Sequence, residues 1–581
     1  MAVKPLVIEN FQSGIANSPY VGFADMRNLD VDSEEGVAKL NFLVQRVTPA
    51  AKSGITFTAN AATDVITTAS TLDVDVGSTT GRAVTVSSSG TLPAGLSAGT
   101  IYFLIRVTAT TYKLATSLTN ADAGTAVDIT SAGSGTHTIS VINHGEPKVL
   151  IVDPNVGTKF MLDSNGRVWF DDGTPWRLLP GNTLTNANGN GMGIFKDYLI
   201  VARNDKLDVC KINTAANLGD PQGTSAWTNG WQTLNTGSGA NNPHPVVIGQ
   251  DDIAYIGDGR YVVSIAETSS STFDPATSST YTFTLSALKL PIRYVVQSMV
   301  ENGVNLMVGA AKANIKEAQI FPWDRSSTTY RLPIRVPETS ITAMLTEGNR
   351  TYVAAGTRGV IYVTNGVLLQ ILRKVPVTLS GVPTNTVSIP AMMYHKNKVY
   401  FALNCIGISG IWSLDPLTNS LKLEHIISTG NYGTSSGVRV SALMSYGPEQ
   451  FYAGWADADA GTFGIDSNYL TNFYYSTWYV GYFISPVYIA GSPRSKRTFT
   501  TIEFELDRPL VSGQGVRISY RTNLNSSFTT IGTYDFSTYG AIQSLADTAS
   551  IVDAEVIQLK CELTVGANST ATPRLKAITL Y

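Results

Sequence analysis

Hydrophobic and polar residues alternate along most of the chain, in short runs bounded by Gly, Asn, Ser or Pro. Thr498–Leu506 and Gly515–Arg521 are long examples of this period-two pattern. Such runs are typical of β-strands joined by tight turns. No window of comparable length shows the sustained 3.6-residue period of an amphipathic helix. The pattern therefore predicts an all-β protein.

A second pattern, with a longer period, occupies the middle of the chain. A short apolar strand, a Gly- or Asn-centred turn and a second strand recur from about residue 144 to 480. The recurring strands start at residues 198, 253, 306, 351, 399 and 451, so successive starts differ by 55, 53, 45, 48 and 52. An earlier copy begins at Lys159, followed by a turn at Asn165-Gly166.

Repeats of roughly 40–50 residues that contain four short strands are the sequence sign of a β-propeller. Seven copies over residues 144–480 predict a ring of seven blades, with six or eight as alternatives. An open array of blades would leave two apolar faces in water, so closure is expected. Residues that tolerate positive φ are expected in the hairpins, at Asn204-Asp205, Gly257-Asp258-Gly259 and Thr357-Arg358-Gly359.

The composition of the chain changes on either side of these repeats. Residues 51–143 carry few charged residues and contain strands such as Ala83–Val86 and Ile101–Ile105, which predicts a small inserted β-sandwich-like module. Residues 481–581 carry long alternating strands and predict a C-terminal β-sandwich. Residues 1–50 are predicted to form an N-terminal arm and the first strands. The arm over residues 1–36 is expected to close a blade or reach a neighbouring subunit, since an isolated strand leaves its backbone groups unpaired.

Composition adds a prediction about surroundings. Hydrophobic residues make up 43% of the chain and charged residues only 15%, against roughly 25% in an average soluble protein. This composition is typical of a subunit whose surface is partly covered by neighbouring subunits. The formal net charge of −3 disfavours recruitment of nucleic acid or an anionic membrane by a global field.

The cysteines and the hydropathy of the chain indicate the compartment. Cys210, Cys405 and Cys561 are far apart and lack metal-ligand spacing, so we interpret them as small core residues. The first residues contain no secretory signal pattern, and no stretch approaches the roughly 20 apolar residues that span a bilayer. We expect a soluble product made in a cytoplasm.

Two kinds of motif are candidates for a catalytic or a metal-binding site. Gly433-Thr434-Ser435-Ser436-Gly437 matches the nucleophile elbow of serine hydrolases, but the residues from Val438 onward indicate a strand where that motif needs a helix, so we interpret it as a loop between blades. The acidic stretches Asp457–Gly461 and Asp30–Glu35 offer oxygen ligands for Ca²⁺ but lack the spacing of a calcium loop, so solvated turns are the preferred interpretation.

The remaining candidates also favour structural interpretations. The five histidines, His137, His144, His244, His395 and His425, are never paired at metal-ligand spacing. Gly189–Gly193 does not fit the dinucleotide-binding pattern and is expected to be a loop. The basic cluster Arg494–Arg497 suits a solvated loop or an intersubunit salt bridge better than a phosphate contact. We therefore expect no enzyme activity, no catalytic, cofactor-binding or metal-binding residues, and no cofactor.

Three segments carry a resemblance to a known group of proteins. Glu9–Val31, with its Phe-x-x-Gly element and the phrase Asp25-Met26-Arg27-Asn28-Leu29-Asp30, resembles the start of many bacteriophage virion proteins. Leu92–Tyr102 and Thr111–Leu118 resemble a small module that recurs in phage tail and fibre proteins. Taken with the predicted propeller and sandwich, the layout resembles the tail nozzle or hub proteins of short-tailed phages.

The resemblance implies a structural protein of the virion, assembled in the cytoplasm of a bacterial host. It implies a homo-oligomer, most simply a hexameric ring, that contacts tail adaptor or connector proteins and tail fibres, with the host cell surface as a further partner. Genomic DNA would pass through the lumen without sequence-specific binding. The alternative is a tailspike or fibre-type protein that binds or degrades a surface polysaccharide.

Overall fold

The computed structural model confirms an all-β protein. It describes residues 5–8, 25–27, 29–30, 37–40, 45–48, 53–72, 80–171, 176–179, 189–214, 217–218, 227–235, 243–268, 272–312, 317–375, 387–405, 409–429, 437–468, 481–490, 496–524, 526–565 and 571–581. Helical structure in this part of the chain is confined to α1 (Leu118–Asp122), α2 (Phe536–Tyr539) and a 3-10 turn at Ser278–Thr280. No helix among these residues is long and apolar enough to cross a membrane.

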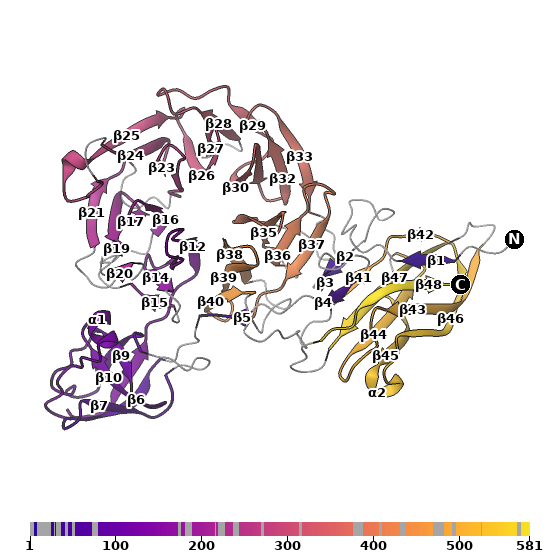
Figure 1. Ribbon diagram of the computed structural model, residues 1–581, viewed down its shortest axis with the longest axis horizontal. Coiled ribbons are helices and arrows are strands. Elements are labelled where there is room, and N and C mark those ends of the chain that lie inside the picture. The colour runs from indigo at the N-terminus through magenta and orange to yellow at the C-terminus, as the bar shows by residue number, and fades with distance from the viewer. Residues whose placement is uncertain are drawn as a thin grey trace.

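Units of four antiparallel strands follow one another around a ring, which is the arrangement of a β-propeller (Figure 1). Blade 1 contains β12 (Pro147–Val152), β13 (Lys159–Asp163), β14 (Val168–Asp171) and β15 (Arg177–Leu178). Blade 2 contains β16 (Gly189–Phe195), β17 (Tyr198–Arg203), β18 (Lys206–Lys211) and β21 (Trp227–Thr233), and the short pair β19 (Asn213–Thr214) and β20 (Asn217–Leu218) follows β18. Blade 3 contains β22 (Val246–Ile248), β23 (Ile253–Asp258), β24 (Tyr261–Glu267) and β25 (Tyr281–Lys289).

The remaining blades continue in chain order. Blade 4 contains β26 (Tyr294–Asn302), β27 (Asn305–Lys312), β28 (Ala318–Trp323) and β29 (Ile334–Val336). Blade 5 contains β30 (Ile341–Glu347), β31 (Arg350–Ala355), β32 (Val360–Thr364) and β33 (Leu369–Lys374). Blade 6 contains β34 (Met392–His395), β35 (Lys398–Leu403), β36 (Gly410–Leu414) and β37 (Leu421–His425). Blade 7 contains β38 (Val438–Tyr446), β39 (Gln450–Asp457), β40 (Thr462–Ser467) and β5 (Gln45–Arg46).

Every repeat start read from the sequence falls on the second strand of a blade. The predicted strands correspond to β13, β17, β23, β27, β31, β35 and β39. These strands are almost wholly buried, as in β13, where all five residues are buried. The hairpin positions also agree, because Asn204, Gly259 and Gly359 adopt positive φ.

Blade 7 takes its outer strand from near the N-terminus. Arg46 pairs with Asp466 and Gln45 with Ser467, so residues 45–46 complete a blade whose other strands lie about 400 residues later in the chain. The Arg46 guanidinium donates to the carbonyl of Phe463 at 2.6 Å and lies 5.5 Å from the centre of the Trp455 ring. Closure of a blade was predicted for the arm over residues 1–36. The strand that closes blade 7 instead lies later in the chain, at residues 45–46.

The inserted module is a closed barrel, so the prediction of a sandwich-like module is wrong in its architecture. Its strands are β6 (Ile55–Asn60), β7 (Val65–Thr68), β8 (Ala83–Ser88), β9 (Ile101–Arg106), β10 (Thr111–Ala115) and β11 (His137–Val141). They close in the order β10-β7-β6-β11-β8-β9. Residues along strands alternate between core and solvent in barrels as they do in sandwiches, so the sequence pattern did not separate the two.

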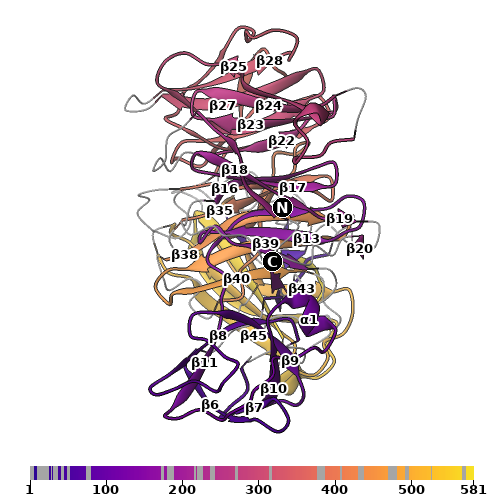
Figure 2. The same cartoon turned by 90° about the vertical axis from the view of Figure 1, so that its left-hand side faces the viewer.

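The barrel is docked on blade 1. Arg177 of β15 is buried and its Nη1 donates to both carboxylate oxygens of Asp122 in α1, at 3.0 and 2.9 Å. Barrel side chains such as Phe103 and Leu118 belong to the same apolar cluster as Trp176. Figure 2 shows the barrel at the end of the molecule away from blades 3 and 4.

The C-terminal region contains two sheets that share one core. One sheet has the order β1 (Leu6–Ile8), β48 (Leu575–Leu580), β43 (Arg497–Leu506) and β46 (Ser544–Ala554). The other contains β41 (Gly481–Ile484), β47 (Val556–Thr564), β44 (Gly515–Arg521) and β45 (Thr529–Asp535), with β42 (Tyr488–Ile489) paired to β47.

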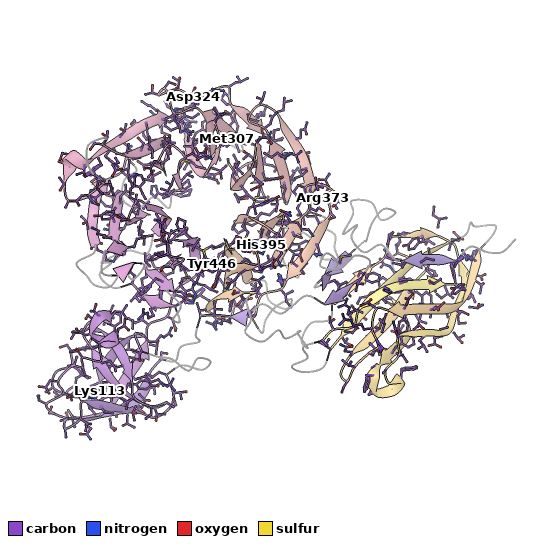
Figure 3. The ribbon with its side chains drawn as sticks, in the orientation of Figure 1. Lys113, Met307, Asp324, Arg373, His395 and Tyr446 are labelled. Carbon is purple, nitrogen blue, oxygen red and sulfur yellow. The ribbon has the colours of Figure 1, made fainter. Side chains whose placement is uncertain are left out.

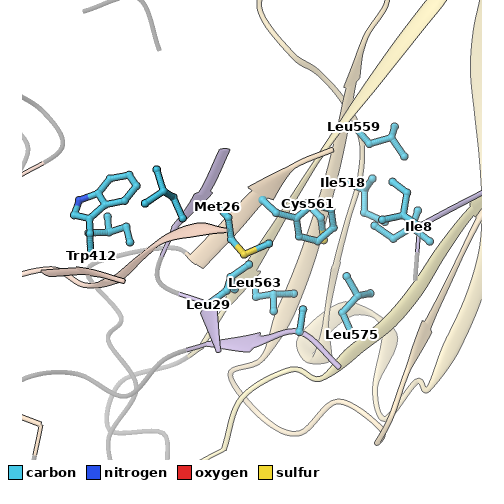
Figure 4. Close-up of a cluster of buried hydrophobic side chains, with 14 of the residues drawn as sticks. Ile8, Met26, Leu29, Trp412, Ile518, Leu559, Cys561, Leu563 and Leu575 are labelled. Carbon is cyan, nitrogen blue, oxygen red and sulfur yellow. The ribbon is translucent and has the colours of Figure 1, made fainter. Parts of the chain in front are cut away.

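One strand of the N-terminal arm joins this second sheet to the propeller. β2 (Asp25–Arg27) pairs with β37 of blade 6 on one side and with β41 on the other, which gives a continuous ten-stranded sheet. Met26 and Leu29 are wholly buried, and Leu29 belongs to β3 (Leu29–Asp30), which pairs with β4 (Lys39–Leu40). Figure 4 shows both side chains between Trp412 of blade 6 and Cys561 of β47. The described strands of the arm therefore pair within their own chain.

We predict that the ring closure depends measurably on one hydroxyl. Thr48 is buried and its Oγ1 accepts hydrogen bonds from the Ile465 amide at 3.1 Å and from Arg46 Nε at 3.3 Å. Thr48→Val removes the acceptor of both hydrogen bonds, which should lower the free energy of unfolding by about 1–3 kcal/mol. Thr48→Ser keeps the oxygen and is the matched control. All eight tryptophans lie between residues 169 and 478, so their fluorescence during urea unfolding reports on the propeller. Equal stability of the two variants would contradict the prediction.

Candidate functional site

The serine motif lies mostly outside the described residues, since only Gly437 of Gly433–Gly437 is described. The next residues form β38, the first strand of blade 7. The expectation of a strand in place of the helix of a nucleophile elbow is therefore confirmed.

The acidic stretch at Asp457–Gly461 is the hairpin between β39 and β40. Asp457 is buried and accepts hydrogen bonds from Thr429 Oγ1 at 2.8 Å and from the Ala460 amide at 3.1 Å. Asp459 accepts from the Gly437 amide at 3.1 Å. Of the second stretch, Asp32, Glu34 and Glu35 lie outside the described residues. Among the residues that are described, no group of three or more His, Cys, Asp or Glu side chains is placed to hold a metal ion.

Three of the histidines, His137, His144 and His244, lie in separate places and contact backbone or hydroxyl groups. His137 is in the barrel, where Nδ1 lies 2.9 Å from Ser88 Oγ and Nε2 lies 3.0 Å from the Ala132 carbonyl. His244 packs between blades 2 and 3, with Nδ1 2.7 Å from the Gly257 carbonyl and Nε2 2.8 Å from that of Asn204. Burial lowers the pKa of His144 to about 4. His395 and His425 end β34 and β37 and contact the ring of Phe451.

The cysteines are buried, as expected of core residues. Burial raises the pKa of the Cys210 and Cys561 thiols far above the usual value, so both stay protonated at neutral pH. Of the basic cluster, Arg494 and Ser495 lie outside the described residues, and Lys496 pairs with Glu555 at 3.8 Å.

The glycine-rich segment Gly189–Gly193 is a strand, so the prediction of a loop is wrong. It forms the first part of β16, which pairs with β17. A Cβ on Gly191 would lie 1.6 Å from the His244 carbonyl oxygen, and one on Gly193 would lie 2.5 Å from a methyl of Val246. The glycines are required because the next blade approaches the backbone of β16 closely.

Buried carboxylates at the blade junctions were missed from the sequence. Asp163 in blade 1 accepts from the amides of Gly145, Asn165 and Arg167 at 2.9 Å each and from Trp169 Nε1 at 3.0 Å. Asp466 in blade 7 has the same kind of surroundings. It accepts from Ser428 N at 2.7 Å, Ser428 Oγ at 2.6 Å and Trp455 Nε1 at 2.8 Å. These carboxylates hold the loop that enters a blade, so their role is structural.

A bidentate ion pair joins the first and last blades. Arg439 of β38 donates to the two oxygens of Glu146, just before β12, at 2.9 and 2.6 Å, and Lys148 adds a contact at 3.2 Å. Burial acts to raise the pKa of Glu146, but the two cations hold it below its usual value. The pair therefore supports ring closure from the inner strands.

The surface that stands out for interaction is the outer edge of blade 5. We define the blade 5 edge as Val367, Leu368 and Ile371 of blade 5 together with Leu417 from the neighbouring turn between β36 and β37 of blade 6, and their exposed fractions are 74%, 64%, 67% and 89%. A hollow of about 290 Å³ adjoins it, lined in part by Tyr352, Val363, Leu368, Leu372 and Pro416. Figure 3 places Arg373 of β33 at the outer margin of the ring. Exposed apolar patches of this kind mark interaction sites.

A second hollow lies on the barrel. This groove, of about 720 Å³, is lined by Thr56–Ala59, Thr67–Ala69 and Ala132–His137. Its lining contains hydroxyl groups and small residues and no Asp, Glu, Lys or Arg. Such a surface offers hydrogen bonds to a neutral ligand and no charge to an ionic one.

Comparisons with known proteins identify no family for this chain. No protein-family model matches the sequence, and no curated protein matches it. One similar solved structure is the computationally designed Ika8 protein, at 11% identity and TM-score 0.35, over 59% of this chain and 94% of the designed one. Another is the β-propeller domain of Cps50 (Swd1) from Myceliophteria thermophila, at 12% identity and TM-score 0.39, over 56% and 97% of the two chains.

These similarities are too distant to carry an argument, and the class of the protein follows from its own sheets. The order and pairing of the strands define a β-propeller protein with an inserted six-stranded barrel and a further β-sheet region.

We predict that Asp466 makes the stability of the propeller depend on pH. Burial raises its pKa to about 6, despite its three hydrogen bonds and the nearby charge of Arg46. In the unfolded chain an Asp carboxyl loses its proton near pH 3.9. Because the folded group holds its proton more tightly, it contributes to the free energy of unfolding fully below that pH, and this contribution is lost as the pH rises through about 6. Asp466→Asn removes this titration. Between pH 4.5 and 7.5 the wild-type protein should lose about 2 kcal/mol of stability relative to Asp466→Asn, measured by urea unfolding. A constant difference between the two proteins would refute the prediction.

Proposed function

We propose that the protein is a structural component of a bacteriophage tail, of the nozzle or hub type, and that it acts as a subunit of a ring around the DNA-exit channel. The observation that carries the proposal is the way its β-modules are joined. The arm strand β2 binds the propeller and the C-terminal sheets into one sheet, and Arg177 fixes the barrel to blade 1. Such a chain is suited to bearing load between neighbours.

Two further observations support an assembled state. The blade 5 edge exposes apolar side chains that a lone subunit would leave in water. The chain as a whole carries few charges, at 15% of residues. In this function the chain is a virion protein rather than an enzyme, and its partners are further copies of itself, adaptor or connector proteins and tail fibres, with DNA passing through the lumen.

We expect electron cryomicroscopy of particles purified from the source of this sequence to place the chain in a ring at the distal end of the tail, most simply with sixfold symmetry. Mass spectrometry of the same particles should detect the full chain. Copies located away from the tail axis, or absent from the particles, would eliminate the proposed function.

The barrel groove favours a second function, that of a tailspike or fibre-type protein. Its hydroxyl-rich lining suits a neutral surface polysaccharide. A glycan-binding and degradation assay with the full chain and host polysaccharide separates the two functions. Thr58→Lys and Thr136→Lys in the groove should abolish any binding if the groove is the site, whereas Lys289→Glu on blade 3 should leave it unchanged. Sustained hydrolysis of the polysaccharide would overturn the expectation that the chain is not an enzyme.

A further inference from the structure

We propose that the blade 5 edge receives strand β46 from the C-terminal region of a second copy of this chain, in a head-to-tail contact. The proposal rests on the proposed function as a ring subunit and names the two surfaces that would meet.

The receiving surface differs from the outer strands of blades 2, 3 and 6. β37 of blade 6 is covered by β2, and all five of its residues are buried. β21 and β25 of blades 2 and 3 expose mainly Thr, Asn and Ser. β33 instead exposes Ile371 beside Val367 and Leu368, and no strand in the described part of the chain pairs with its outer side. It is an open edge with an apolar face.

The receiving surface also carries positive charge. Arg350 lines the hollow, and Lys374 ends β33 and is exposed. Neither makes an ion pair with a described carboxylate. A partner for this edge therefore needs apolar side chains and at least one acidic group.

Strand β46 has both features. It is eleven residues long, lies at the end of its sheet, and contains none of the Lys or Pro residues that commonly block an open edge. Val552 is 62% exposed, and Ile489 of β42, which pairs with the start of the following strand β47, is 76% exposed. The carboxyl of Asp553 is exposed and has no ion pair among the described residues.

The two strands belong to different regions of one chain, which the ten-stranded sheet holds apart (Figure 1). Because the surfaces differ, contact between copies is head-to-tail, and a head-to-tail contact gives a closed ring when its rotation closes. This is the geometry that the proposed function requires. The complementary charges of Lys374 and Asp553 favour it over pairing of β33 with a second β33, which brings like charges together.

Charge exchange in the full-length protein tests the contact. Lys374→Glu and Asp553→Lys should each weaken self-association by at least about tenfold, since each places like charges together. The double variant should restore association to within a few-fold of the wild type, as measured by sedimentation velocity over a range of concentrations. Lys289→Glu, on the outer strand of blade 3, is the matched control and should have no effect.

A cross-link gives an independent readout. Ile371→Cys combined with Val552→Cys should form disulfide-linked chains under mild oxidation, and the native cysteines do not interfere because they are buried. Val304→Cys with Val552→Cys is the control, since Val304 is 67% exposed on blade 4. Cross-linking of Ile371→Cys alone would show a symmetric contact and overturn the proposal, as would a double charge variant that stays dissociated or a wild-type chain that is monomeric throughout. A ring observed in particles together with a failed charge exchange would reject this contact and leave the proposed function standing.

Discussion

The pairing of residues 45–48 with blade 7 is the contact on which the ring depends. A blade buries both faces only if its neighbours are in place, so a ring that opens at one junction exposes two apolar faces at once. Here three interactions of different kinds meet at the same junction: the β5 ladder with Asp466 and Ser467, the Arg46 contact with Phe463 and Trp455, and the Glu146–Arg439 pair on the inner side. The outer and inner parts of the junction are thus secured separately.

The same N-terminal segment also sets the relation between propeller and C-terminal region. β1 adds to the edge of one C-terminal sheet, β2 lies between blade 6 and the other, and β5 closes blade 7. Met26 and Leu29 fill a core that contains side chains from blade 5, blade 6 and both C-terminal sheets. Burying each such side chain contributes about 1.5–3 kcal/mol, so displacing the arm would loosen several regions together. The regions are joined because one N-terminal segment contributes a strand to each of them.

The ring could be predicted from the sequence because its repeated strands are buried on both faces. Residues such as Leu199, Ile256 and Phe401 have zero exposure, so each second strand is an unbroken apolar run that stands out at a regular spacing.

The barrel was harder to predict, because the alternation of core and solvent residues in Ala83–Ser88 is the same whether the sheet closes into a barrel or stacks on a second sheet. Gly191 was misjudged because its close neighbour, His244, lies 53 residues later. The pairing of Arg46 with Asp466 joins residues 420 apart, and no local pattern encodes it.

The chemical candidates were interpreted from their local sequence context. For the serine motif this context was the strand expected after Gly437, and the structure confirms that strand. No sequence pattern marked Asp163 and Asp466 as buried acceptors. The one feature that each has is a Trp nearby in the sequence, six residues after Asp163 and eleven residues before Asp466.

The distribution of covered and open edges in the molecule is uneven, and it bears on what the chain is built to do. Blade 6 has its outer strand covered by β2, and the buried pair Lys422–Glu424, at 3.1 Å, lies on that strand. Such a pair is tolerated only where water is excluded and the charges find partners, as Glu424 does with Ser413 at 2.6 Å. Next to it, blade 5 has an outer strand with a bulge between its pairs to Ile361 and Tyr362, exposed apolar side chains, and no covering strand among the described residues. Two adjacent blades of the same ring thus differ in one feature. The outer strand of blade 6 is covered by a strand of the same chain, and the outer strand of blade 5 is not covered by any described strand. A strand from outside the chain is the addition that would make them alike, and this is why we propose the outer edge of blade 5, rather than any buried polar cluster, as the contact surface.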